Sequence, residues 1–246
     1  MQTLVKGHEQ SSKISSPAGL TRLLTPGPTL SLHDKSTPDR ADIESYIAQQ
    51  FHKVHGAHIH DFMPILLNID CRRTPIAALG IRPAGDQDLF LEQYLPRNIE
   101  SFVSQTAGYS VSRQHITEIG NLVATQRGGS QLLFLILTAL LQQSQFDWVV
   151  FTATPLVDRM MTRMGMELHE LYDADPALLT NSHISEWGSY YDSQPKVVTV
   201  NVAAAMASLC QRKAYKNIIT LYQNRVAELA LTLDEMGCHG AHSLSA

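Results

Sequence analysis

The sequence has few cysteines for its length: Cys71, Cys210 and Cys238 are the three in 246 residues. Their number is odd, and no two of them form a Cys-x-x-Cys pair. Neither a disulfide framework nor a cysteine-based zinc site is therefore expected. Because free thiols are typical of reducing compartments, we expect a cytoplasmic protein.

Long apolar runs are also missing. The longest, Leu132 to Leu141, is roughly half the length that a membrane-spanning helix needs. The first residues of the chain are polar and lack the apolar segment of a signal peptide. We expect neither export through such a signal nor stable insertion into a membrane.

No excess of basic charge is present either. The chain carries 19 basic and 23 acidic residues, for a formal net charge of −4. A protein without a basic surface gives no reason to expect a nucleic-acid partner. Hydrophobic residues make up 44% of the chain and charged residues 17%, which favours a packed core over disorder.

The chain divides into three parts by composition. Residues 1–28 resemble a flexible tail, residues 29–202 a folded domain, and residues 203–246 a C-terminal helical extension. Within the domain a helix and a strand meander come first, and strands then alternate with helices. That order predicts an α/β fold with a mixed sheet and helices on both faces. The strands are expected at residues 29–33, 63–69, 75–81, 88–94, 114–124, 147–154 and 196–202, and residues 167–172 are expected to form a further strand or a turn.

A glycine turn precedes the most apolar helix. Gly128 and Gly129 lie directly before a helix that we expect to begin at Ser130. The N–H groups and the dipole at a helix N-terminus attract a phosphate or a carbonyl oxygen. The spacing matches neither a Walker loop nor Gly-x-Gly-x-x-Gly, and an ordinary connecting turn is the simpler explanation.

Glu118 is the second unusual feature, because it lies inside an apolar strand next to Ile119. An acid at such a position is costly unless it is paired or functional. If it faces a cleft, burial raises its pKa, and it can take a proton from an ammonium group. Alternatively, it pairs with an arginine such as Arg113 or lies at an exposed edge.

Two further groups suggest chemistry less directly. Tyr190 and Tyr191 lie in an aromatic loop, where they either supply hydroxyl groups to a cleft or act as packing anchors. Met160, Met161 and Met164 lie on one predicted helix. Methionine adapts to variable shapes, so these side chains either line an acyl channel or belong to an ordinary core.

A cluster of histidines raises the question of a metal site. His52, His55, His58 and His60 fall within one short stretch. Gly56 interrupts the helix, and no Asp, Glu or Cys stands at a supporting helical spacing. We therefore expect no metal there. The sequence also contains neither Gly-x-Ser-x-Gly nor His-Glu-x-x-His.

Several longer segments resemble one known family, the thermostable hemolysins. The resemblance covers about residues 29–202 and rests on FMPILLNI (62–69), AALGIRPA (77–84), LFLEQYL (89–95), EIGNLVA (118–124), FDWVVFTAT (146–154) and WGSYYD (187–192). That family is similar to the GNAT superfamily and to acyl-homoserine-lactone synthases. The resemblance implies a GNAT-like, mostly antiparallel central sheet and an N-acyltransferase. The donor would be acyl-CoA or an acyl-carrier protein, and the acceptor a small amine such as an amino acid.

The resemblance also implies roles for individual residues, with the pantetheine arm of the donor between strands 117–124 and 147–154. Glu118 would deprotonate the amine, and Tyr190 or Tyr191 would protonate the leaving thiolate. The donor site would comprise Leu122, Val123, Ala124, Arg127, Gly128, Gly129 and Ser130. The other substrate contacts would be Asn121, Phe151, Thr152, Met160, Met161, Met164 and Trp187.

Two departures from the GNAT pattern leave alternatives open. TQRGGS (125–130) only approximates the GNAT phosphate loop, which leaves coenzyme A and a carrier protein as competing donors. Met161 stands where many GNAT enzymes carry a tyrosine acid. Two other functions compete with acyl transfer: direct membrane damage by a hemolysin, and a non-catalytic GNAT-like binding protein. A homodimer is one option for assembly.

Overall fold

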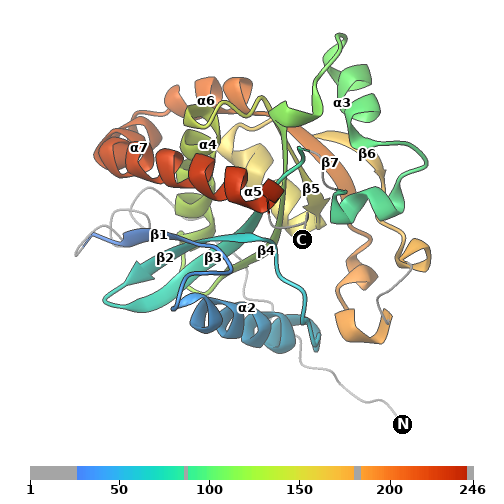
Figure 1. The fold of residues 1–246 in the computed structure, drawn as a ribbon, viewed down its shortest axis with the longest axis horizontal. Helices are drawn as coiled ribbons and strands as arrows, with labels where there is room; N and C mark the ends of the chain where they lie inside the picture. The colour runs from blue at the N-terminus through green and yellow to red at the C-terminus, as the bar shows by residue number, and fades with distance from the viewer. Residues whose placement is uncertain (1–26, 86–87, 180–183, 243–246) are drawn as a thin grey trace.

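A computed structural model describes residues 27–85, 88–179 and 184–242 of the chain, so most of the expected tail lies outside the described residues. One seven-stranded sheet has the order β1-β2-β3-β4-β5-β7-β6 (Figure 1). Among the described strand pairs, only β4 and β5 are parallel and the other neighbours are antiparallel, which confirms the predicted mixed sheet. The strands are β1 (Thr29–His33), β2 (Ile65–Cys71), β3 (Thr74–Pro83), β4 (Ile116–Ala124), β5 (Trp148–Ala153), β6 (His169–Asp173) and β7 (Lys196–Asn201).

Helices cover both faces of this sheet (Figure 1). Successive residues of a strand point to opposite faces. Leu66 accordingly packs in the cluster under α2, whereas Leu67 packs in the cluster around α4. The helices are α2 (Arg40–His55), α3 (Ile99–Ala107), α4 (Gly129–Gln143), α5 (Pro155–Met164), α6 (Val202–Cys210) and α7 (Lys213–His242).

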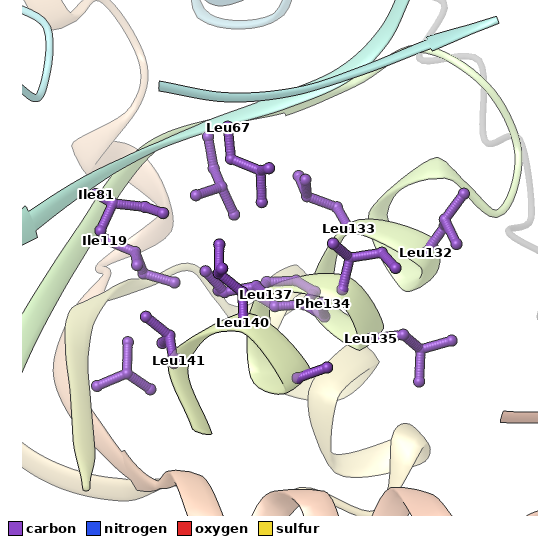
Figure 2. Packing of buried hydrophobic residues seen from close by; sticks show 14 of the residues in the cluster. Leu67, Ile81, Ile119, Leu132, Leu133, Phe134, Leu135, Leu137, Leu140 and Leu141 are labelled. Atoms are coloured by element: carbon purple, nitrogen blue, oxygen red, sulfur yellow. The ribbon is translucent and has the colours of Figure 1, made fainter. Parts of the chain in front are cut away.

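The helix α4 is the centre of the main core. Its side chains from Leu132 to Leu141 are all buried, which fits a helix that is apolar on every side. Figure 2 shows Leu67, Ile81 and Ile119 on the sheet side of this helix. The opposite side of α4 packs against α6 and α7.

The C-terminal helices share this core with the sheet. Val226 and Leu229 of α7 are 2% exposed and lie in the cluster around α4. The Tyr222 hydroxyl donates to the Pro28 carbonyl at 3.3 Å, and Arg225 Nη2 donates to the Leu30 carbonyl at 2.8 Å. These two bonds tie α7 to β1, at the other end of the chain.

One predicted strand is absent. Residues 88–94 were expected to be extended, but Phe90–Tyr94 form a 3₁₀ helix, η1. Leu91 and Tyr94, three residues apart, are the buried members of this turn, and a spacing of three matches a 3₁₀ helix. The N–H groups of Phe90 and Leu91 donate to the Glu118 side chain instead of to a neighbouring strand.

Candidate active site

The two parallel strands at the centre of the sheet separate. Among the described residues, β4 and β5 pair only where Ile116–Glu118 lie beside Trp148–Val150. Beyond Glu118, β4 continues beside β3, and β5 continues beside β7. A cavity of about 680 Å³ lies at this divergence, and side chains of both strands line it. The cavity has the size of an ordinary small-molecule site.

A bulge in β4 shapes one wall of the cavity. Gly80 of β3 pairs with Gly120, but Ala78 pairs with Val123, so β4 carries one extra residue over this stretch. Asn121 takes up the irregularity with a φ of 51°. Such a bulge bends a strand away from its partner and is frequent beside active sites.

The Asn121 side chain fixes the loop that follows α2. Its Oδ1 accepts the N–H of Met63 at 2.9 Å, and its Nδ2 donates to the Asp61 carbonyl at 3.4 Å. The Met63 side chain lies directly over Gly80 and Gly120, where any Cβ atom would clash with it. Asn121 also lines the cavity, but both polar atoms of its side-chain amide are hydrogen-bonded to the loop.

Glu118 lies at the point where the strands diverge, and it lines the cavity although it is only 2% exposed. Its two carboxylate oxygens accept the N–H groups of Phe90 and Leu91, each at 2.9 Å. Arg82 Nη1 lies 3.6 Å from Oε2. Burial raises the pKa of Glu118 to about 7, against the lowering effect of Arg82 and the two N–H groups. Near neutral pH, this carboxyl group can both accept and release a proton.

The tyrosine pair forms hydroxyl contacts beside the cavity. The Tyr190 hydroxyl lies 3.0 Å from Thr152 Oγ1, and the Tyr191 hydroxyl lies 2.6 Å from that of Tyr94. Burial raises the pKa of Tyr190, and it raises that of Tyr191 to about 12. Both phenols therefore stay protonated near neutral pH and can act as hydrogen-bond donors.

The loop that carries these tyrosines is docked on the end of α2. The Ser189 N–H donates to the His55 carbonyl at 2.8 Å, and the His58 N–H donates to the Glu186 carbonyl at 2.6 Å. Gly188 has a φ of 54°, and a Cβ atom there would lie 2.0 Å from the His55 oxygen. Only glycine fits this approach without displacement of the backbone.

The glycine turn before α4 divides the expected donor residues. Leu122, Val123, Ala124 and Ser130 line the cavity, whereas Arg127, Gly128 and Gly129 are not among its lining residues. Gly128, with a φ of 87°, caps the helix, and the N–H of Gly129 donates to the Gln126 carbonyl at 2.9 Å. The structure therefore brings the first turn of α4 to the cavity through Ser130.

The other expected substrate contacts also divide. Phe151, Thr152, Met160 and Trp187 line the cavity. Met161 and Met164 do not, because they face the main core, where they are 2% and 0% exposed. Of these three methionines only Met160 therefore lies at the cavity, and its acyl-lining role stays a prediction.

Sequence reasoning missed several residues of the cavity wall, among them Arg82, Phe90, Tyr94 and His55. Arg82 stands opposite Glu118 in the register of β3 and β4. Phe90 and Tyr94 reach the cavity because η1 folds back over Glu118. The sequence held one signal for these residues, the acid Glu118 inside an apolar strand. A buried carboxylate requires hydrogen-bond donors around it, but the sequence does not identify which residues supply them.

No group of three His, Cys, Asp or Glu side chains is placed to hold a metal ion in the part of the chain that the structure describes. The rings of His52 and His58 lie in contact instead, with centroids 4.7 Å apart. Over the same described residues, no helix has both the length and the hydropathy required to cross a bilayer.

Comparison with known proteins identifies the fold. The acyl-homoserine-lactone synthase LasI superposes with a TM-score of 0.51 at 13% sequence identity, over 74% of this chain and 94% of LasI. TofI in its apo form superposes with a TM-score of 0.50, also at 13% identity, over 76% of this chain and 99% of TofI. This likeness confirms the GNAT-like fold.

Comparison of the sequence itself identifies the family. No curated protein matches the chain. The family model of the thermostable hemolysins matches residues 33–206, which include all seven strands except the first residues of β1. The chain belongs to the thermostable hemolysin family.

Proposed function

We propose that this protein is an acyltransferase that moves an acyl group from a thioester donor to an amine. The observation that carries the proposal is the buried Glu118 at the mouth of the gap between β4 and β5. The site therefore has a proton acceptor beside a mainly apolar cavity of about 680 Å³. Thioester aminolysis needs both, together with donors for the developing oxyanion.

The donor is proposed to lie between the two separated strands. No strand pairs with the β5-facing edge of β4 beyond Glu118, as far as the described residues show. The amides of a pantetheine arm can bond to such an edge as an added strand does. A phosphate at the end of the arm would approach Ser130, where the N-terminus of α4 favours negative charge. Acyl-CoA and acyl-carrier protein share this arm, and both remain candidates.

The reaction is proposed as direct transfer. Glu118 takes one proton from the acceptor ammonium, and the freed amine attacks the thioester carbon. As the N–C bond forms and the C–S bond breaks, Tyr190, which contacts Thr152 of β5, gives its hydroxyl proton to the thiolate sulfur. The second amine proton passes to the Tyr190 oxygen, which restores the phenol. The products are an amide, a thiol and the proton held by Glu118, which passes to solvent.

The test is acyl transfer by the purified protein. Acyl-CoA and acyl-carrier-protein donors are incubated with a panel of amines, and amides are detected by mass spectrometry. Glu118→Gln is expected to lower the product rate by about 100-fold or more, as loss of a general base does. The matched control is Glu186→Gln, since Glu186 also lines the cavity and bonds to His58 through its backbone carbonyl, which the substitution keeps. Equal rates for wild type and Glu118→Gln would refute the role of Glu118.

The family name suggests direct membrane damage as a competing function. Under the proposal, any haemolytic effect comes from an amphiphilic N-acyl product. Purified protein without donor or acceptor should therefore leave lipid vesicles intact. Leakage of vesicles under those conditions, together with no amide product, would favour the competing function.

A further inference from the structure

Arg82 differs from the buried Arg40 in its hydrogen bonding. Arg40 donates to the carbonyls of Met63 and Pro64 at 2.7 and 2.8 Å. Arg82 lines the cavity, and none of its guanidinium nitrogens donates a hydrogen bond to any residue that the structure describes. Its nearest acidic atom is Glu118 Oε2 at 3.6 Å, and its side chain is 24% exposed. Its N–H donors are therefore available to a molecule in the cavity.

Arg82 and Glu118 together present opposite charges to one small region. They are paired in the register of β3 and β4, so both side chains lie on the same face of the sheet. A zwitterion that lies alongside the pair can place its ammonium group at Glu118 and its carboxylate at Arg82. The carboxylate oxygens match the planar fork of the guanidinium group. A simple amine would leave the arginine unused.

An aromatic wall begins beside this pair. The Phe90 N–H is bonded to Glu118, and the Phe90 ring lies 5.9 Å from the ring of Trp187. Trp187 in turn lies 5.9 Å from Tyr191 in an edge-to-face contact. All three rings line the same cavity. A further ring bound there gains edge-to-face or offset contacts that an aliphatic chain does not.

We infer that the acceptor is an α-amino acid with an aromatic side chain, whose carboxylate is bound by Arg82. The inference rests on the proposed acyl transfer and specifies its acceptor. Glu118 binds the ammonium group and removes its proton, and the wall formed by Phe90, Trp187 and Tyr191 contacts the side chain. The product is then an N-acylated aromatic amino acid that retains its free carboxylate.

The experiment compares acceptors that differ in a single group. Phenylalanine and phenethylamine share the ring and the amine, but only phenylalanine has the carboxylate. The rates of acyl transfer to each are measured for wild type, Arg82→Gln and Arg82→Lys. Wild type is expected to favour phenylalanine in kcat/KM by about 10- to 100-fold, the range for hydrogen bonds to a charged group. Arg82→Gln is expected to abolish this preference, and Arg82→Lys to retain part of it.

A matched control separates carboxylate recognition from general damage. Arg159 of α5 also lines the cavity but is exposed. Arg159→Gln is expected to leave the preference for phenylalanine unchanged. A structural role for Arg82 would lower the rates of both acceptors equally, so an unchanged ratio in Arg82→Gln overturns the inference. Leucine as acceptor tests the aromatic wall, and a rate for leucine equal to that for phenylalanine overturns that part.

Failure of the proposed function leads to a different pattern. If no amide forms with any donor or amine, acyl transfer is wrong, and binding measured by calorimetry in the presence of coenzyme A decides the inference. Binding of phenylalanine that weakens about 10- to 100-fold in Arg82→Gln then supports an amino-acid site. Equal binding by wild type and Arg82→Gln, or binding by neither, overturns it.

Discussion

Replacement of Glu118 by glutamine should change how the stability of the protein depends on pH. Burial raises the pKa of this carboxyl group from its ordinary value of 4.5 to about 7. Between these two values the folded state therefore holds a proton that the unfolded state has released. The free energy of unfolding falls as pH rises wherever the folded state binds more protons. The wild-type protein thus loses stability from about pH 4.5 to about pH 7, and Glu118→Gln avoids that loss.

The magnitude follows from the difference between the two pKa values. At about 1.4 kcal/mol for each pH unit, the wild type should lose on the order of 3 kcal/mol across this range relative to the variant. Glutamine also turns an NH₂ group toward the N–H of Phe90 or Leu91, which adds a cost. That cost is the same at every pH. The pH dependence of the difference in unfolding free energy between wild type and Glu118→Gln therefore reports the titration of Glu118 alone.

The assay is urea unfolding of both proteins from about pH 4.5 to about pH 7.5. Glu92→Gln is the matched control. Although burial opposes it, hydrogen bonds from Arg113 lower the pKa of Glu92 below its ordinary value of 4.5. Glu92 is therefore charged in both the folded and the unfolded state once the pH is about one unit above that value. From there to about pH 7.5, the difference in unfolding free energy between Glu92→Gln and wild type should stay constant. If the difference in unfolding free energy between Glu118→Gln and wild type also stays constant with pH, the raised pKa of Glu118 is refuted.

Two other substitutions test the walls of the cavity. Phe134 and Ile119 line both the main cavity and a small apolar void beside β5. Phe134→Leu should open this void and raise kcat/KM about fourfold for each extra CH₂ that the donor chain buries there. The same dependence of kcat/KM on donor chain length in wild type and variant would contradict this prediction. Gly188→Ala should displace the loop from the His55 carbonyl and lower kcat/KM about tenfold or more. Gly108→Ala is its control, since it has a φ of 78° but no atom within 4 Å of the added Cβ, and it should cost only about 1 kcal/mol of stability.

Local patterns in the sequence were sufficient for the order of most elements. In the sequence Ile43, Ile47 and Phe51 follow one another at steps of four, a helical spacing, and Gly56 comes shortly after. These residues form α2 with all three apolar side chains buried, and Gly56 caps its end. The apolar run from Leu132 predicts a buried helix, and α4 is that helix. These signals depend on neighbours within a few residues, so the sequence contains them directly. The prediction was wrong for residues 88–94, where the η1 turn is fixed by its contacts with Glu118.

The sequence also indicated where the candidate site lies, but not its composition. An acid in an apolar strand marked Glu118, because such a residue requires a compensating partner. The partner itself, Arg82, follows from the antiparallel register of β3 and β4, which pairs residues far apart in the chain. The orientation of α5, with Met160 at the cavity and Met161 in the core, depends on which side of the helix the sheet covers. Register and helix orientation are decided by long-range packing, and for that reason only the tertiary structure determined them.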